Sequence, residues 1–336
     1  MKRSVIKGTG RYIPPRLVTN ADLTQWMDTT DDWIVQRTGI EQRYWVSEEG
    51  NTGASDLALE AAKIAMERAQ WTHDDVDMII LGTLSPDINF PGSACLLQDK
   101  LGLGPVPSLD IRQQCTGFIY GLATADAYIK AGLANRILVV GTEVHSTGLD
   151  ISTRGRDVAV IFGDGAAVAC VEGVDTNENV GVMASALHAD GKHADLLMLE
   201  APASRLPERL THEMLDEGRH YPIMNGSAVF KQAVRRLPEV TYEVLEKAAL
   251  SIEDIKLIIP HQANLRINQM YQKTLKLPDG IVFNNIQKYG NTTAASIPIA
   301  LDEALEKGLI GKSGDTILFV GFGAGLTWGG VVYRFP

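Results

Sequence analysis

Two segments of the chain repeat the same order of apolar and polar positions. MERAQWTHDDVDMIIL, residues 66–81, aligns without gaps with LEKAALSIEDIKLIIP, residues 245–260. Each pattern is typical of a helix end, an acidic turn and a buried strand. The preserved order of the matches indicates a duplicated unit, although generic helix-turn-strand segments can also match by chance. Two further pairs of segments match in the same order, residues 97–104 with 271–278 and 136–141 with 316–321.

Alternation of helices and buried strands within a duplicated unit favours a layered α/β fold with mostly parallel strands. If the two copies pack about a pseudo-twofold axis, equivalent loops from each copy can meet at one site. Sites in such folds lie where strands leave the sheet. The residues that follow the buried strands are therefore the first candidates for chemistry.

Three chemically informative residues lie at such strand exits. Cys115 follows the strand-like VPSLDI at residues 106–111 and begins a uniformly apolar segment, which predicts a buried helix. Asn291 lies at almost the same place before the corresponding helix of the second copy. His261 follows the buried strand that ends at Pro260. We therefore expect the thiol, the imidazole and the amide to come together.

Each of these residues also has a simpler interpretation. Free cysteines are frequently buried without a reactive role, a histidine can be hydrogen-bonded in a polar pocket, and Asn291 can cap a helix. At a helix N-terminus, however, Cys115 experiences the positive end of the helix dipole, which favours the nucleophilic thiolate. Together, the three groups suit transfer of an acyl group through a thioester on Cys115.

The His and Asn side chains suit a second step of such a reaction. Both offer N–H donors, which can hold the oxygen of a second thioester while its α-carbon becomes a carbanion. No strong base is needed if loss of CO₂ from a malonyl group generates that carbanion. This scheme differs from a protease triad, in which the Asn would only orient the His.

The glycine-rich C-terminal segment FVGFGAGLTWGGVVYRF contributes a loop to this site. Leu326 stands where a dinucleotide fingerprint needs its third glycine, and a strand-like sequence follows instead of a helix. We therefore expect a tight loop whose backbone amides approach a ligand.

Composition and charge narrow the class of protein. The 336 residues carry a net charge of −10, which disfavours nucleic acid as a partner. No apolar run approaches the about 18 residues of a membrane-spanning helix, and the N-terminus shows no secretion signal, which predicts a cytoplasmic protein. Three cysteines without a CxxC pair argue against disulfides and structural zinc. Cys95 and Cys170 are expected to be small core residues.

With these residues in view, the sequence resembles the thiolase-fold condensing enzymes, and specifically the β-ketoacyl-ACP synthase III family. The resemblance implies a thiolase-like duplicated fold, layered αβαβα with mostly parallel mixed sheets. It also implies an N-terminal half, residues 1–175, with the nucleophilic cysteine, and a C-terminal half, residues 176–336, with the His/Asn pair. It runs along the whole chain and rests on these motifs in family order: DDWIVQRTGI, DIRQQCTGF, RGRDVAVIFGDGAA, MNGSAVFKQAV, HQANLRI, YGNTTAASIPIAL and GFGAGLTWG.

The resemblance further implies a decarboxylative Claisen condensation. An acyl-CoA starter would load Cys115, malonyl-ACP would lose CO₂ with the help of His261 and Asn291, and a β-ketoacyl-ACP would leave. No cofactor or metal would be bound permanently, because coenzyme A enters as part of the substrate. The partners would be acyl-CoA, the acyl carrier protein and a second copy of the chain in a homodimer, with Phe90 reaching the partner's acyl pocket.

Other residues take roles from the same resemblance. The oxyanion hole would consist of the amides of Cys115 and Ala324, and Phe322 would give the malonyl carboxylate an apolar neighbour. The adenine of coenzyme A would lie between Trp33 and Arg156. Coenzyme A would contact, in all, Trp33, Arg37, Arg156, Met224, Gly226, Phe230 and Asn264. The carrier protein would be received by Lys231, Arg235 and Arg266.

Two features depart from the usual family pattern. Arg112, Gln113 and Gln114 precede the nucleophile, where small residues are common, and this variant is also similar to condensing enzymes for aromatic or medium-chain acyl-CoA. Residues 200–222 are longer and more charged than the usual roof of the substrate entrance. The alternatives are therefore a related acyltransferase of secondary metabolism or an inactive acyl-CoA-binding homologue. The sequence leaves open the starter, the pathway and the choice between malonyl-ACP and malonyl-CoA.

Overall fold

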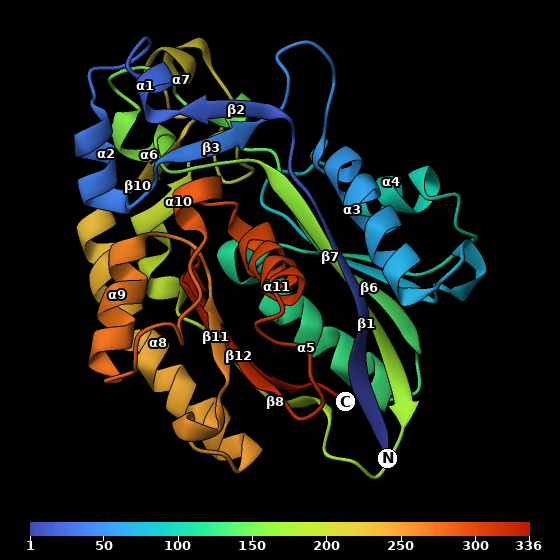
Figure 1. Ribbon diagram of the computed structural model, residues 1–336. Helices are drawn as coiled ribbons and strands as arrows, with labels where there is room; N and C mark the ends of the chain where they lie inside the picture. Colours follow the sequence, from blue (N-terminus) through green and yellow to red (C-terminus); the bar gives the residue numbers. More distant parts are fainter.

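Two β-sheets form the frame of the molecule, of which the computed structural model describes residues 1–336 (Figure 1). The first sheet has five strands in the order β1-β7-β6-β4-β5, and the second has four in the order β11-β12-β13-β8. The strands of the first sheet are β1 (Lys2–Tyr12), β4 (Met78–Gly82), β5 (Ser108–Ile111), β6 (Arg136–Glu143) and β7 (Gly165–Asp175). Those of the second are β8 (Gly181–Ala189), β11 (Leu257–Pro260), β12 (Thr316–Gly323) and β13 (Thr327–Arg334).

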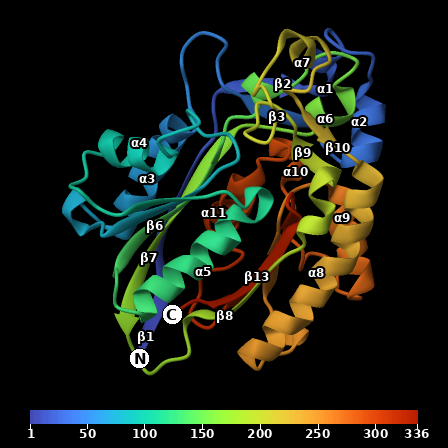
Figure 2. The same ribbon diagram turned by 180° about the vertical axis from the view of Figure 1, so that it is seen from behind.

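Helices separate and cover the two sheets (Figures 1 and 2). The largest apolar core joins the two helices between the sheets to both sheets, through side chains such as Phe118, Ile297 and Phe319. Two further cores fill the outer layers, so the αβαβα order expected from the sequence is confirmed. The helices between the sheets are α5 (Gly117–Lys130) and α11 (Ser296–Glu306). The outer helices are α3 (Ala54–Ala69) and α4 (Ser93–Lys100) on the first sheet, and α8 (Gly226–Ala248) and α9 (Leu265–Thr274) on the second.

The remaining elements gather at one end of the layers (Figure 1). An apolar cluster that includes Ile34, Trp45 and Val160 holds much of this end together. None of the helices has both the length and the apolar composition that a membrane crossing requires. The elements at this end are β2 (Arg16–Thr19), β3 (Gln42–Trp45), β9 (Leu197–Leu199), β10 (Pro222–Met224), α1 (Asn20–Leu23), α2 (Asp31–Thr38), α6 (Arg156–Ala159), α7 (His212–Asp216) and α10 (Ile286–Tyr289).

The strand register repeats the sequence match between the two copies. Ile79 pairs with Leu138 in the first sheet, and the matched Ile258 pairs with Leu318 in the second. The duplication indicated by the apolar and polar pattern is therefore present in the strand pairing itself. The acidic turns before these strands are also alike, since both are short 3₁₀ helices closed by a capping box, η1 (His73–Asp75) and η5 (Ile252–Asp254).

Parallel pairing is limited to one side of each sheet. It joins β4 to β5 and β6, and β11 to β12. The pairs β1–β7, β6–β7, β12–β13 and β8–β13 are antiparallel. The sheets are mixed as expected, but the expectation that parallel pairs form the majority was wrong. The reason is that each copy ends with a strand, β7 or β13, that runs back along its predecessor and pairs with the first strand of that copy.

A buried carboxylate on α11 joins the second copy to the first. Asp302 is 1% exposed and accepts hydrogen bonds from Thr9 Oγ1 and Arg68 Nη1, each at 2.6 Å, and it also pairs with Arg11. Thr9 and Arg11 belong to β1, and Arg68 belongs to α3. Removing one partner of a buried charge pair costs about 3–5 kcal/mol. This network therefore fixes the central helix α11 against the first sheet.

Gly141 on β6 lies at a second close contact between the two copies. This contact allows a prediction about stability. A Cβ at Gly141 would lie 2.3 Å from the carbonyl oxygen of Ala294, just before α11. We expect Gly141→Ala to lower the free energy of unfolding by about 1–3 kcal/mol, because the turn before α11 must move. Gly104→Ala is the control, since nothing lies within 4 Å of its Cβ, and it should change stability by less than about 0.5 kcal/mol. Urea denaturation that found equal stability for both variants would contradict the close approach.

Candidate active site

A cavity of about 660 Å³ is lined by residues from both copies of the duplicated unit. Cys115, which follows β5, His261, which follows β11, and Asn291, which follows α10 and not a strand as expected, all line it. About half of the lining residues are hydrophobic, as in sites that bind ligands with aliphatic parts. The cavity is also lined by six other residues singled out in the sequence, Met224, Gly226, Phe230, Asn264, Phe322 and Ala324.

Cys115 lies on a strained turn at the start of a central helix. The turn, η2 (Gln114–Thr116), leads directly into α5, and Gln114 has a φ of 44°, in the left-handed region that side chains rarely adopt. The matched turn of the second copy, η6 (Thr293–Ala295), leads into α11 and has a φ of 45° at Thr293. Such conformations persist only where the surrounding structure holds them. The duplicated fold therefore places a strained turn before both central helices, and the first carries the cysteine.

The glycine-rich loop at the end of β12 packs directly against the cysteine. A Cβ on Gly323 would lie 2.7 Å from Cys115 Sγ, so only glycine fits at this position. The backbone N–H groups of Ala324 and of Cys115 itself both lower the pKa of this thiol, as donors close to the sulfur do. These are the two donors that the sequence resemblance assigns to an oxyanion hole, and the structure brings them to the same atom.

Burial keeps Cys115 in its thiol form. The residue is 7% exposed, and loss of hydration raises the pKa of its thiol from 9.0 to about 12. The N–H of Ala324 acts in the opposite direction, and the negative charge of Glu143 adds to the increase. The N–H groups at the helix start favour the thiolate as expected, but the loss of hydration outweighs them and the pKa rises.

The other two cysteines differ from each other. Cys170 is buried on β7, as expected. Cys95 on α4 is exposed, so the expectation that it belongs to the core was wrong. Its helix buries Ala94 and Leu97, which leaves position 95 on the solvent side.

Ser296 determines which nitrogen of His261 carries the proton. His261 Nδ1 lies 2.7 Å from Ser296 Oγ, and the same oxygen accepts the backbone N–H of Gln262 at 3.3 Å. Nδ1 is the only hydrogen-bond acceptor within reach of the Ser296 hydroxyl proton, so we assign that proton to the bond with Nδ1 and the imidazole proton to Nε2. Nε2 is buried and has no hydrogen-bond partner within the protein. His261 therefore presents an N–H donor at the cavity wall.

The Asn291 side chain is oriented by the turn that follows it. Its Oδ1 accepts the backbone N–H of Thr293 at 2.8 Å, so the two hydrogens on Nδ2 stay available for a ligand. Its backbone is held as well, since the N–H donates to Ile161 O at 2.9 Å and the carbonyl accepts the Gly163 N–H at 3.1 Å. Asn291 and His261 thus both present N–H donors.

A second buried histidine supports this turn. His145 Nε2 lies 2.8 Å from Thr293 Oγ1, and its ring packs against Phe162 with 4.6 Å between ring centres. Burial lowers the pKa of both His145 and His261 from 6.5 to about 3. Both rings are therefore neutral at neutral pH, and His261 can donate from Nε2 without adding a charge to the site.

The three residues expected to hold an adenine lie together, outside the lining of the cavity. Arg37 Cζ is 4.3 Å and Arg156 Cζ is 4.5 Å from the ring centre of Trp33 on α2. Arg156 Nη1 also donates to the carbonyl of Asp28 at 2.6 Å. A base that bound between Trp33 and Arg156 would have to displace the guanidinium from the indole ring.

The three basic residues expected to face a carrier protein are exposed on α8 and α9. Lys231 follows the cavity residue Phe230, and Arg266 is two residues from Asn264, whose Oδ1 caps α9. Arg235 pairs with Glu239 at 3.0 Å, so part of its charge is compensated. The cationic side chains of Lys231 and Arg266 therefore lie close in sequence to the cavity wall.

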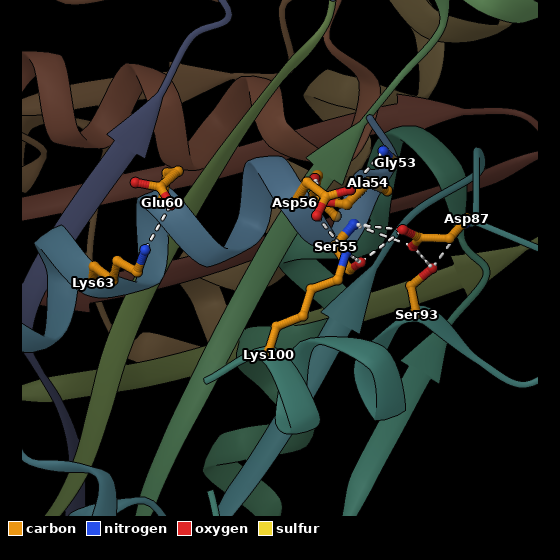
Figure 3. A network of polar contacts seen from close by, with 10 residues as sticks. Gly53, Ala54, Ser55, Asp56, Glu60, Lys63, Asp87, Ser93 and Lys100 are labelled. Atoms are coloured by element: carbon orange, nitrogen blue, oxygen red, sulfur yellow. Dashed lines mark hydrogen bonds and ion pairs between the residues drawn. The ribbon is translucent and has the colours of Figure 1, made fainter. Parts of the chain in front are cut away.

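The segment after β4 forms one wall of the cavity and is anchored by Asp87. The Asp87 carboxylate accepts hydrogen bonds from Ser55 Oγ and Ser93 Oγ, both at 2.6 Å, and from the Ser55 N–H at 3.1 Å (Figure 3). Lys100 Nζ donates to Ser55 Oγ at 2.8 Å. Three residues farther along, Phe90 is 82% exposed. The wall is thus tied to the starts of α3 and α4, while Phe90 extends into solvent from this chain.

The long charged segment at residues 200–221 joins the two strands of the β9–β10 hairpin. Both strands line the cavity, as does His220 at the end of the segment. Its base is closed by a hydrogen bond from the Ala201 N–H to Arg219 O at 3.1 Å and by an ion pair between Arg219 and Glu200 at 2.5 Å. Within residues 200–221 only His220 lines the cavity, so the long charged segment contributes little to its wall.

Three supporting residues were not anticipated from the sequence: Ser296, Thr293 and His145. The first two lie in GNTTAAS, which reads as a helix start, and the position of Thr293 opposite Gln114 in the duplicated pattern was the available signal. No local pattern distinguishes His145 from other residues that follow a buried strand. Its role depends on a contact between the two copies, which only the structure shows.

Two family profiles of known proteins match this chain, one in each copy of the duplicated unit. The profile of the family described as 3-Oxoacyl-[acyl-carrier-protein (ACP)] synthase III matches residues 109–191, and the profile of its C-terminal part matches residues 245–335. The β-ketoacyl-[acyl-carrier-protein] synthase III of Caldanaerobacter subterraneus subsp. tengcongensis is 46% identical over 329 residues, which is 98% of this chain and 97% of that protein.

Solved structures show the same similarity in three dimensions. The 3-oxoacyl-[acyl-carrier-protein] synthase III of Aquifex aeolicus VF5 has a TM-score of 0.88 and 41% identity and covers 100% of both chains. The corresponding synthase III of Thermus thermophilus has a TM-score of 0.89 and 42% identity and covers 99% of both chains. The similarity therefore includes the sequence and the fold from end to end.

The two neutral histidines generate a prediction for stability against pH. Between pH 6.5 and about 3 an imidazole binds a proton in the unfolded chain but not in the folded protein, so stability falls as pH falls through this window. Each histidine contributes a slope of up to about 1.4 kcal/mol per pH unit. We expect His145→Gln and His261→Gln each to reduce the slope by about this amount, measured by urea denaturation at several pH values. Slopes that match the parent protein would show that the folded protein protonates these rings.

Proposed function

The chain belongs to the β-ketoacyl-[acyl-carrier-protein] synthase III family, and from this premise we propose that it condenses an acyl-CoA starter with malonyl-ACP. It is an acyltransferase of the condensing class. The observation that carries the proposal is that one cavity contains a thiol from the first copy and two N–H donors from the second. Loss of CO₂, a β-ketoacyl-ACP product and free coenzyme A follow from this combination.

In the first step, the Cys115 sulfur attacks the carbonyl carbon of the acyl-CoA. The new C–S bond forms on Cys115, the bond to the coenzyme A sulfur breaks, and the proton of the thiol leaves with coenzyme A. The high pKa of the buried thiol requires this proton to be transferred during the step rather than before it. The N–H groups of Cys115 and Ala324 receive the charge that develops on the carbonyl oxygen.

In the second step, the malonyl thioester loses its carboxylate as CO₂. The electron pair of the breaking C–C bond moves into an enolate, whose oxygen accepts hydrogen bonds from His261 Nε2–H and Asn291 Nδ2–H. Neither group has to accept a proton, which agrees with the neutral imidazole. Phe322 is 5% exposed at the cavity wall, and its apolar ring favours conversion of a carboxylate into uncharged CO₂.

In the third step, the carbanion attacks the acyl group on Cys115. A C–C bond forms, the oxyanion again lies at the Ala324 and Cys115 N–H groups, and the Cys115 sulfur leaves and takes up a proton. The sum of the steps consumes acyl-CoA, malonyl-ACP and one proton, and it yields β-ketoacyl-ACP, coenzyme A and CO₂. No oxidant, reductant or metal enters this balance.

The substrate path extends from the cavity to the surface in this proposal. The pantetheine arm passes Met224, Gly226, Phe230 and Asn264, and the adenine enters at Trp33 by displacing Arg156, with Arg37 nearby. The carrier protein docks on a cationic rim. That rim consists of Lys231, Arg235 and Arg266.

The same proposal includes a homodimer and two structural halves. Phe90, which is 82% exposed in this chain, reaches the acyl pocket of a second copy. The proposed halves are residues 1–175 and 176–336, and support for them is that the strands of each large sheet come from one half only. A related acyltransferase with an aromatic or medium-chain starter is not favoured, because the relatives at 43–46% identity are β-ketoacyl-ACP synthases III.

The decisive experiment separates the two half-reactions. We expect acetyl-CoA or a longer acyl-CoA to add one acyl mass to the parent protein and none to Cys115→Ala, because the thioester forms on that sulfur. His261→Ala should load normally but release CO₂ from malonyl-ACP at least about 10²-fold more slowly, because an enolate donor is lost. Intact-protein mass spectrometry measures loading, and release of labelled CO₂ measures decarboxylation.

Cys95→Ala is the matched control for loading, since Cys95 is the exposed cysteine outside the cavity. It should acquire the same acyl mass as the parent protein. An acyl adduct on Cys115→Ala would refute the assigned nucleophile. Decarboxylation by His261→Ala at the parent rate would refute the assigned donor.

A further inference from the structure

Glu143 is a buried acid that the proposed reaction does not use. It ends β6, is 0% exposed and forms no ion pair. Its oxygens instead accept hydrogen bonds from N–H groups on two separate segments. Those of Leu84 and Ser85 donate at 3.1 and 3.2 Å, and that of Ala294 donates at 3.2 Å. The hydroxyls of Ser85 and Thr83 complete the set at 2.7 and 3.2 Å.

The two segments bound by this carboxylate belong to different copies and different parts of the cavity. Leu84 and Ser85 line the wall that follows β4 in the first copy. Ala294 lies in η6 of the second copy, beside Thr293, whose N–H orients Asn291. One side chain therefore connects the cavity wall of the first copy to the turn that aims the Asn291 amide.

We propose that Glu143 is a positioning residue, which holds η6 against the first copy and thereby keeps Asn291 aimed at the malonyl thioester. It acts through the N–H of Ala294 and the turn, and it does not contact the substrate. The inference rests on the proposed function, because it assigns Glu143 to the decarboxylation half-reaction.

The division of bonds between the two oxygens makes this role separable from packing. Oε2 accepts both donors of Ser85, whereas Oε1 accepts the Ala294 N–H. The N–H of Leu84 lies within reach of both oxygens. In Glu143→Gln, the amide oxygen is favoured on the side of Ser85, where most donors lie. The new NH₂ group then faces the Ala294 N–H. The variant therefore keeps the hydrogen bonds to the cavity wall and loses the hydrogen bond to η6.

The charge of Glu143 gives the experiment a second signal. Burial raises the pKa of Glu143 to about 7, against the lowering effect of its hydrogen bonds, and its negative charge raises the pKa of the Cys115 thiol. Glu143→Gln removes this charge, so alkylation of Cys115 by iodoacetamide should shift to lower pH. Glu143→Asp retains the charge, but it is one methylene shorter and cannot reach both Ser85 and Ala294.

The test compares decarboxylation, loading and alkylation in the full-length protein. We expect Glu143→Gln to lower kcat for malonyl-ACP decarboxylation about 10-fold, as loss of one aligned hydrogen bond predicts, with acyl-CoA loading not slowed. Glu143→Asp should also lower kcat about 10-fold but leave the pH of alkylation unchanged. Thr83→Val is the matched control, because it removes one hydrogen bond to Oε2 on the wall side only and Thr83 does not line the cavity, so its decarboxylation kcat should stay within about twofold.

The outcomes separate this inference from the proposed function. A parent protein that neither loads Cys115 nor releases CO₂ would overturn the function itself. A parent protein with both activities, together with Glu143 variants that decarboxylate at the parent rate, would overturn the positioning role alone. Equal slowing of loading and decarboxylation in both Glu143 variants would overturn it too, since that result indicates general damage to the fold.

Discussion

Two hydrogen bonds within the protein determine what this site can do, because each uses up one polar atom of a candidate catalytic side chain. The hydroxyl of Ser296 occupies Nδ1 of His261, and the N–H of Thr293 occupies Oδ1 of Asn291. What remains on each side chain is a donor, Nε2–H or Nδ2–H₂. A pair of neutral donors stabilises an enolate oxygen but removes no proton, which suits a carbanion formed by loss of CO₂.

The duplicated fold explains why these donors lie near a thiol. Both copies place a strained turn before a central helix, with φ near 45° at Gln114 and Thr293. The two turns approach each other closely, since a Cβ at Gly117 would lie 3.1 Å from the Ala294 Cβ. Equivalent turns have thus acquired different functions: one carries Cys115, and the other orients Asn291 and supplies Ser296 to His261.

Much of this arrangement can be predicted from the sequence. The order of apolar and polar positions predicted the duplication, the buried helix after Thr116 and the strand before His261, because burial imposes these patterns locally. The prediction that most strand pairs are parallel was wrong, because pairing of the first and last strands of each copy depends on contacts between distant segments. The net effect on the pKa of Cys115 could not be predicted for a similar reason: a helix start is visible in the sequence, but the degree of burial is not.

The supporting residues illustrate the same limit within the site. Ser296 contacts His261 within the second copy, whereas the contacts of His145 with Thr293 and of Glu143 with Ala294 join the two copies. These roles depend on distances that arise only when segments far apart in the chain pack together. Of the residues that a motif makes recognisable, Cys115 and His261 come shortly after β5 and β11, so their place at the sheet ends can be inferred from sequence order, whereas Asn291 follows the short helix α10.

The ¹⁵N NMR spectrum of the His261 imidazole tests the central claim most directly, because it reports which ring nitrogen carries the proton. At neutral pH the account predicts a neutral ring with hydrogen on Nε2 and none on Nδ1, and a loss of this preference in Ser296→Ala. A ring protonated on Nδ1 alone, or an imidazolium, would contradict it, since His261 would then lack the donor or carry the charge that the mechanism excludes.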